Sequence, residues 1–241
     1  MTKQESKLGF LKTLAIALLC AGIVRSFFFE PFHIPSSSMK PNLLIGDYIF
    51  VAKYSYGYSR YSFPFAPNLF EGRKWKTAPQ RGDVAVFRLP SNPNINYVKR
   101  VIGLPGDKIQ MRDDVLFINN VAVEKIADGS FFDSDDQVEI EIKKFIENLP
   151  EGKQVKILDQ RPDSAQDNTG TYEVPAGHYF MMGDNRDNSQ DSRFLTQVGY
   201  VPEENLVGRA TIIFFSNGRP TWEFWQWPNS IRFNRIFRKV Q

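Results

Sequence analysis

The feature that most constrains this chain is an apolar stretch close to its N-terminus. Its charge-free part, residues 13–24 (TLAIALLCAGIV), would extend only about 18 Å as a helix. The longer stretch from Leu8 to Phe29 reaches about 33 Å, enough to cross the roughly 30 Å hydrocarbon core of a bilayer. Lys12 and Arg25 lie near its two ends, so their side chains can extend toward opposite membrane surfaces. The sequence therefore predicts one transmembrane anchor at residues 8–29.

A cleaved secretory signal is the competing interpretation, because it also has a basic start and an apolar middle. Cleavage requires small residues at −1 and −3, and LLCAG offers only Cys20 and Gly22. A lipoprotein cut before Cys20 would require a small residue where Leu19 stands. These weak sites favour an anchor that is retained.

Three lysines, Lys3, Lys7 and Lys12, lie at the start of the chain. The positive-inside rule then predicts that residues 1–7 form a cytoplasmic tail. Residues 30–241 are expected outside the cytoplasm, with the lipid bilayer as a partner.

Composition limits what these later residues can be. The chain is 42% hydrophobic and 14% aromatic, which is enough for a substantial core without disulfides. The sole cysteine, Cys20, excludes an intrachain disulfide. A net charge of only +3 gives no reason to expect nucleic-acid binding.

The segment after the anchor is predicted to be mainly β. Short β-branched or aromatic runs bounded by Gly, Pro or Asn occupy residues 48–54, 82–89, 97–104, 174–184 and 206–215. Residues 109–123 indicate a hairpin with its turn at Asp113–Asp114. Residues 124–171 are polar, with one helix-like stretch near 138–148, and suggest a variable insert.

Two segments are unusually aromatic for a solvated surface. One is residues 54–75, and the other is residues 221–227 (TWEFWQW), which precede the basic run at 231–240. If 231–240 were helical, Phe233 and Phe237 would lie on one side and most cations on the other, as at a membrane interface. Ordinary core packing followed by a basic tail is an equally good interpretation.

The sequence PSSSMKP, residues 35–41, places three serines between two prolines. Serine-rich turns are common because their hydroxyls bond to the local backbone, so a polar turn is the simplest interpretation of this stretch alone. A serine nucleophile would need a base. His33 and His178 lie outside metal-binding and GxSxG patterns, and we expect structural roles for both.

A lysine can serve as the base only when it is neutral, which requires burial to lower its pKa from about 10.4. Lys99 in YVKRVIGLPGD lies inside an apolar strand and should point to the same side as Tyr97 and Val101. A lysine at a sheet edge is the alternative. A third stretch, residues 183–193 (GDNRDNSQDSR), contains Ser189, which could orient an amine, and an Asp–Arg couple that could brace the loop. Its spacing does not match a calcium loop, and a solvated turn is the alternative.

Five motifs occur in a characteristic order: PSSSM, LLIGDYI, RGDVAVF, YVKRVIGLPGD, and GDNRDNSQDSR through VPEENLVGRA. Together with the N-terminal anchor, this order resembles that of bacterial type I signal peptidases, the leader peptidases. These are membrane-bound Ser–Lys endopeptidases that remove signal peptides from exported preproteins, after small residues at −1 and −3. The resemblance implies a β-rich catalytic domain, with residues of about 105–178 as a more variable β subdomain. It also implies a place in the bacterial inner (cytoplasmic) membrane, with the catalytic domain on the extracytoplasmic side.

The same resemblance assigns roles to residues. Ser38 matches the nucleophile, Lys99 the general base, and Ser36 the hydroxyl that joins the Ser38 backbone N–H in the oxyanion hole. Ser189 matches the serine that positions the lysine, supported by Asp191 and Arg193. The matching substrate-pocket residues are Phe32, Ile34, Pro35, Leu43, Ile49, Val86, Tyr97 and Val98. The family implies no metal and no cofactor.

One position departs from the family pattern. Ser37 stands where glycine is usual, and it would be strained if the backbone there had φ > 0.

Three other functions share some of these features. A self-cleaving repressor peptidase would need a DNA-binding domain in place of the apolar stretch. A specialised Ser–Lys peptidase of a conjugation or pilus system remains open, as does an anchored β-rich binding protein with an inert serine and lysine.

Overall fold

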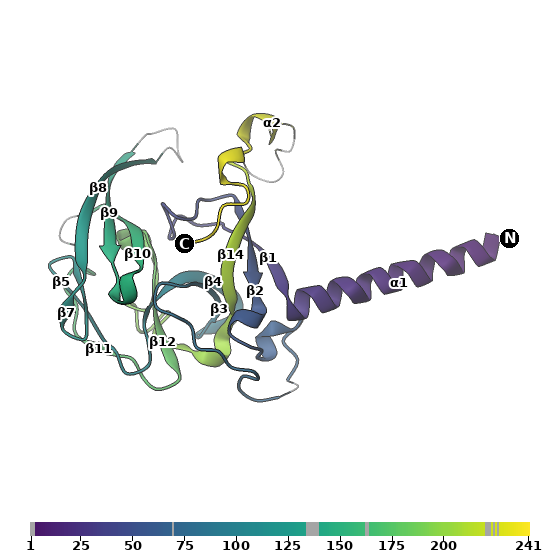
Figure 1. Ribbon diagram of the computed structural model, residues 1–241, viewed down its shortest axis with the longest axis horizontal. Coiled ribbons are helices and arrows are strands. Elements are labelled where there is room, and N and C mark those ends of the chain that lie inside the picture. The colour runs from purple at the N-terminus through teal and green to yellow at the C-terminus, as the bar shows by residue number, and fades with distance from the viewer. Residues whose placement is uncertain are drawn as a thin grey trace.

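The computed structural model describes residues 3–68, 70–133, 140–161, 164–219, 223, 225 and 227–241, with the backbone alone at 3–8 and 229. Helix α1, Lys3–Phe27, projects away from the rest of the molecule (Figure 1). Its residues Gly9–Phe27 are long and apolar enough to cross a membrane, and very little of them is buried. The helix ends before the predicted boundary at residue 29, because Phe29 already pairs with Ala52 in a sheet.

The body of the molecule is mainly β, as the sequence predicts. Seven strands form one sheet in the order β1-β2-β14-β3-β4-β12-β13, and all neighbouring pairs are antiparallel. Their bounds are β1 Phe29–His33, β2 Asp47–Ala52, β3 Val84–Leu89, β4 Asn92–Gly103, β12 His178–Met182, β13 Val201–Pro202 and β14 Leu206–Ser216. Five of these strands, β2, β3, β4, β12 and β14, lie in the five regions where the sequence predicts strands, so those predictions are confirmed.

Two smaller sheets lie between β4 and β12 in the sequence. One has the order β10-β9-β8 and the other β11-β5-β6-β7. Their bounds are β5 Lys108–Arg112, β6 Val115–Ile118, β7 Val121–Ala122, β8 Glu124–Asp133, β9 Ile140–Asn148, β10 Gln154–Asp159 and β11 Tyr172–Glu173. The hairpin turn at Asp113–Asp114 is confirmed, with φ of 46° and 61° at the two positions.

The expected helix near 138–148 is wrong for residues 140–148, which form strand β9, and residues 138–139 lie outside the described residues. In IEIKKFIEN the charged residues fit alternation in a strand as well as a helical pattern. Pairing with β8 on one side and β10 on the other decides in favour of the strand.

The short helices lie mostly in connections. Helix α2 spans Trp227–Ser230, and one-turn helices lie at Lys53–Ser55, Arg60–Ser62, Pro150–Gly152, Arg186–Asn188, Glu203–Asn205 and Phe233–Arg235. The helical interpretation of residues 231–240 is wrong, because only Phe233–Arg235 forms a single helical turn and the chain after it runs along β14. Phe237 N donates to Ile213 O (2.7 Å) and Val240 N donates to Thr211 O (2.9 Å).

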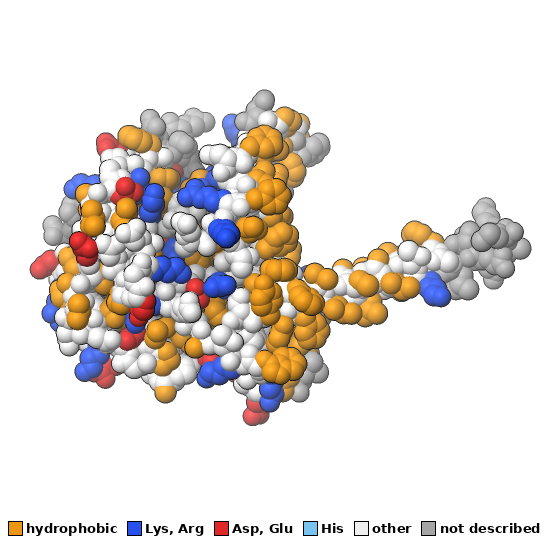
Figure 2. Space-filling view, viewed as in Figure 1, with side chains coloured by type: hydrophobic (Ala, Val, Ile, Leu, Met, Phe, Trp, Pro, Cys, Tyr) orange, Lys and Arg blue, Asp and Glu red, His pale blue; other side chains and the backbone are white. Residues whose placement is uncertain are grey.

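The aromatic residues of 54–75 gather at the base of α1. Phe27 contacts the rings of Tyr58 and Phe63 at centroid distances of 5.6 and 5.5 Å, and Tyr58 Oη donates to Phe27 O at 2.7 Å. Phe65 and Trp75 are largely exposed. Figure 2 shows hydrophobic side chains along the face of the body from which α1 leaves. This segment therefore joins the helix to the body and also exposes apolar surface.

Candidate active site

The three serines lie in the loop that joins β1 to β2. Ser36 is exposed, Ser37 is half-buried and Ser38 is 8% exposed. Two backbone bonds fix this turn: Lys40 N donates to Ser37 O (3.0 Å), and Asn185 N donates to Ser38 O (3.1 Å). The second bond ties the serine loop directly to the 183–193 loop.

Lys99 comes from β4 and reaches the same point. Its Nζ is hydrogen-bonded to Ser38 Oγ, and the residue is only 4% exposed. Burial lowers the pKa of Lys99 to about 8, against the opposing effect of the Asp191 and Asp184 carboxylates. Nζ also lies 5.4 Å from the centre of the Tyr97 ring, in keeping with the expected strand alternation. The structure thus contains a buried amine of lowered pKa in contact with a serine hydroxyl.

The other two serines surround this pair. Ser36 Oγ lies 3.3 Å from Ser38 Oγ. Ser37 Oγ accepts a hydrogen bond from Asn188 Nδ2 (2.9 Å), and its backbone does not adopt a positive φ. A serine at the family's glycine position is therefore accommodated without backbone strain, and it adds a second tie to the 183–193 loop.

The 183–193 loop is braced as expected by its Asp–Arg couple. Arg193 Nε and Nη2 each donate to the Asp191 carboxylate at 2.9 Å, and all these groups are buried. Burial alone would raise the pKa of Asp191, but the Arg193 guanidinium and the Gly183 N–H outweigh it and hold this pKa below its usual range. Asp191 is thus a fixed negative charge near Lys99.

Ser189 is 7% exposed and lies beside this brace. Its Oγ is close enough to the Asp191 carboxylate to help lower the pKa of that group, but it has no hydrogen-bond partner of regular geometry among the described residues, and the expected bond to Lys99 is not formed. A Cβ built on Gly183 would lie 2.2 Å from Ser189 Oγ and 2.6 Å from Ser38 O. Gly183 therefore lets the two loops approach, and the lysine-positioning role of Ser189 stays a prediction.

Sequence reasoning missed a buried polar network behind Ser38. Arg100 Nε and Nη2 both donate to the Asp184 carboxylate at 2.7 Å, and Asn42 Nδ2 donates to Asp184 Oδ2 at the same distance. Arg100 and Asp184 are each 1% exposed. The signal was present in the sequence, because both residues lie inside the quoted motifs, immediately next to Lys99 and Gly183.

Most of the expected pocket residues come together. Four of them, Ile34, Leu43, Ile49 and Val86, are buried in one hydrophobic cluster, and Phe32 and Val98 pack against it. Tyr97 belongs to a neighbouring cluster, and its Oη donates to Gln190 Oε1 (2.6 Å). Pro35 is exposed at the entrance of the serine loop.

Neither histidine is hydrogen-bonded to Ser38 or Lys99 within the described chain. The His33 ring lies 4.8 Å from that of Tyr48, and His178 Nδ1 lies 2.9 Å from Ala176 O. Among the described residues, no three His, Cys, Asp or Glu side chains are grouped so that they could hold a metal ion.

Comparison with known proteins fits this geometry. Residues 7–215 match the family described as "Signal peptidase, peptidase S26". The chain belongs to this family. Signal peptidase I of Rickettsia typhi is 40% identical, over 99% of this chain and 94% of that protein. Signal peptidase I of Rickettsia akari is 42% identical, over 94% of this chain and 90% of that protein.

A crystal structure of a signal peptidase I from Enterococcus faecalis V583 is 29% identical, covers 55% of this chain and 97% of that chain, and has a TM-score of 0.32. The S26 family and the full-length relatives show that this chain has signal peptidase I activity and is a serine peptidase with preprotein substrates. Its N-terminal apolar helix is consistent with a membrane anchor.

Proposed function

We propose that Ser38 is the nucleophile of this signal peptidase and that Lys99 is its general base. The observation that supports this most directly is the bond between Lys99 Nζ and Ser38 Oγ, made by an amine that burial has shifted to a pKa of about 8. A neutral amine can accept the serine proton, whereas an ammonium cannot. No histidine competes for this task among the residues around Ser38 that the structure describes.

The reaction then follows in two halves. Lys99 takes the Ser38 hydroxyl proton while Oγ attacks the scissile carbonyl carbon, and the carbonyl oxygen becomes an oxyanion. Its charge is stabilised by the Ser38 backbone N–H and the Ser36 hydroxyl. The C–N bond breaks as Lys99 returns the proton to the leaving amine. Water, deprotonated by the same amine, hydrolyses the acyl-enzyme ester.

Two free strand edges support binding of an extended substrate. β1 is an edge strand of the sheet, and β4 pairs with β12 only from Arg100 onward, so its earlier residues are bonded to β3 alone within the described chain. Lys99 is the last residue of this free portion of β4. A substrate strand added at such an edge gains backbone hydrogen bonds and presents alternate side chains to one face.

The cluster formed by Ile34, Leu43, Ile49 and Val86 supports a preference for small residues at −1 and −3. These side chains are almost completely buried, so a substrate side chain larger than a methyl group would overpack the site. The partly buried Phe32 and Val98 form the rim of the same region.

We further propose that α1 keeps the N-terminus cytoplasmic and the domain from residue 30 outside, with residues of about 105–178 as the variable subdomain. The lysines before the span support this orientation. The exposed hydrophobic side chains beside the base of α1 support contact with the outer surface of the membrane that α1 crosses.

The decisive experiment is cleavage of a model preprotein by full-length wild type and Ser38→Ala in detergent, with Ser37→Ala as the matched control. Ser38→Ala should have no activity above the uncatalysed background, and Ser37→Ala should remain active. A folded, active Ser38→Ala would overturn the assignment. Acylation by a serine-directed probe in wild type alone would exclude an inert binding protein. Cleavage of several unrelated preproteins would exclude a specialised conjugation or pilus peptidase.

A further inference from the structure

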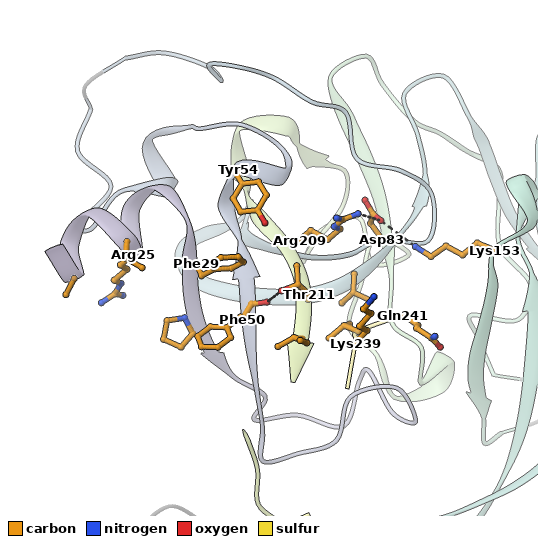
Figure 3. Close-up of a pocket in the computed structure, with 17 residues that line it drawn as sticks. Arg25, Phe29, Phe50, Tyr54, Asp83, Lys153, Arg209, Thr211, Lys239 and Gln241 are labelled. Atoms are coloured by element: carbon orange, nitrogen blue, oxygen red, sulfur yellow. Dashed lines mark hydrogen bonds and ion pairs between the residues drawn. The ribbon is translucent and has the colours of Figure 1, made fainter. Parts of the chain in front are cut away.

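A groove of about 1070 Å³ lies where α1 meets the seven-stranded sheet. Figure 3 shows it extending from Arg25 on the helix to Lys153. Neither Ser38 nor Lys99 lines it, so the peptidase mechanism leaves this groove without a role.

The part of the groove next to the helix is apolar. Ala21 and Val24 of α1 form one wall, and Phe29, Phe50 and Ile212 continue it along β1, β2 and β14. Val24 and Phe29 are substantially exposed. Because the membrane-crossing part of α1 ends at Phe27, lipid chains that surround the helix would meet this wall directly.

The rest of the groove is cationic. Arg25, Lys153, Arg209 and Lys239 line it, and all four are partly or fully exposed. Two carboxylates face them. Arg25 pairs with Glu30 (2.7 Å), whereas Lys153 and Arg209 share Asp83 at 3.5 and 3.7 Å.

Lys239 has no ion pair to a described residue. Gln241, two residues later, is held in place because its backbone O accepts a hydrogen bond from Arg100 (2.8 Å). At the groove, four cationic side chains face the carboxylates of Asp83 and Glu30, and Glu30 is shared with Lys53 (2.7 Å). The carboxylate of the last residue, Gln241, offsets one more of these cations. The positive charge that remains is one that an anion would complement.

We infer that this groove binds one anionic phospholipid from the surrounding bilayer. Its acyl chains would lie against Val24, Phe29 and Phe50, and its phosphate would be held by the cations, chiefly Lys239 and Arg209. The apolar wall gains by burying hydrocarbon, and the cations gain charge-assisted hydrogen bonds to phosphate oxygens. The inference rests on anchoring by α1 and does not require the proposed catalytic roles.

A signal peptide is the other ligand that the position of the groove allows, but the charge of the groove disfavours it. A signal peptide combines an apolar segment with a basic start, so it would bring positive charge to a site that is already cationic. Free inorganic phosphate would use the cations but would leave the apolar wall unused.

The test is native mass spectrometry of the full-length chain released from micelles that contain equal amounts of phosphatidylglycerol and phosphatidylcholine. Wild type should retain one phosphatidylglycerol, and excess inorganic phosphate should not displace it. Each cation removed should lower the preference for phosphatidylglycerol by about fivefold. Arg209→Gln/Lys239→Gln should therefore lose most of it, and the exposed single variant Lys239→Gln keeps the test valid if the double variant does not fold.

The matched control is Lys108→Gln/Lys156→Gln, which removes two exposed cations from the smaller sheets. This control should retain the wild-type preference. The inference fails if wild type shows no preference, if both double variants lose it equally, if inorganic phosphate displaces the lipid, or if a signal peptide cross-links to the groove instead. Lipid retention is measured without substrate, so its result does not depend on whether Ser38 and Lys99 are the catalytic pair.

Discussion

The chemistry of Lys99 depends on its immediate surroundings. Burial disfavours the ammonium and lowers its pKa to about 8, while the nearby Asp191 and Asp184 carboxylates act in the opposite direction. Arg193 and Arg100 bind those carboxylates and so offset part of their effect. The two Asp–Arg pairs therefore help to keep the amine available as a base.

The first prediction concerns pH. Because the neutral amine is the active form, kcat/KM should increase about tenfold per pH unit below the lowered pKa of Lys99 and level off above about pH 8. The double variant His33→Ala/His178→Ala should keep this profile in a preprotein-cleavage assay. A folded double variant that loses the alkaline-rising limb would assign the limb to a histidine and contradict the Ser–Lys mechanism.

The second prediction concerns Ser36, whose Oγ lies 3.3 Å from Ser38 Oγ. Ser36→Ala should lower kcat by about 10²–10³, the usual cost of one oxyanion donor, and should change KM little. Ser37→Ala is the control, because its hydroxyl bonds to Asn188 instead. Full activity in Ser36→Ala would remove Ser36 from the oxyanion hole.

The third prediction concerns Gly183. An added methyl group would collide with Ser189 Oγ and with Ser38 O, so Gly183→Ala should force the serine loop and the 183–193 loop apart. We expect at least a hundredfold loss of kcat, because a shift of about 1 Å in a catalytic group is enough for that. Gly170→Ala, where an added Cβ meets nothing within 4 Å, should behave like wild type in the same assay.

At the scale of elements, the strands were predictable because their cores are short β-branched runs between turn residues. The hairpin at Asp113–Asp114 was equally predictable, since both positions adopt the positive φ that these residues tolerate. β9 was not, because its alternation of Ile, Glu and Lys fits a helix until its partners β8 and β10 are known. The chain after Arg235 was misjudged for a similar reason, because pairing with β14 overrides the local pattern.

In the candidate site, too, local motifs could be predicted from the sequence, whereas contacts between distant segments could not. The serine loop, Lys99 and the 183–193 loop could be identified because each carries a distinctive motif. The hydrogen bond from Asn185 N to Ser38 O, and the close approach of the two loops at Gly183, depend on how segments distant in the sequence pack together. No local pattern in the sequence reports such contacts. The sequence alone leaves the backbone angle at Ser37 undecided and does not indicate its hydrogen bond with Asn188.

The fourth prediction concerns the C-terminal segment. Arg235 donates to both oxygens of buried Asp47 and to Asn42 O, which fixes the loop that carries Ser38. Arg235→Gln leaves the Asp47 carboxylate without its guanidinium, and should lower the free energy of unfolding by about 3–5 kcal/mol. Arg238→Gln, at an exposed position of the same segment, should change stability by less than about 0.5 kcal/mol. Denaturant titration of the full-length protein in detergent measures both.

At the scale of the whole molecule, one helix extends from a β body that is apolar at its base (Figures 1 and 2). Ten residues separate Phe27, at the end of α1, from Ser38, and half of them form strand β1. The body therefore cannot move far from the membrane without unpairing β1 from β2. This short tether fits a peptidase whose substrates are themselves held in the membrane by apolar signal peptides.

The fifth prediction tests the orientation of this arrangement in cells. If α1 is a retained anchor with its lysines on the cytoplasmic side, protease added outside spheroplasts should digest the domain from residue 30 onward. N-terminal sequencing of the mature protein should then begin at or near Met1. Reversing the charge bias with Lys3→Glu/Lys7→Glu/Lys12→Glu should reduce the fraction that protease can reach, because the bias of positive residues sets orientation. A mature start near Gly22 would instead identify the segment as a cleaved signal, and a wholly protected domain would place the peptidase on the cytoplasmic side.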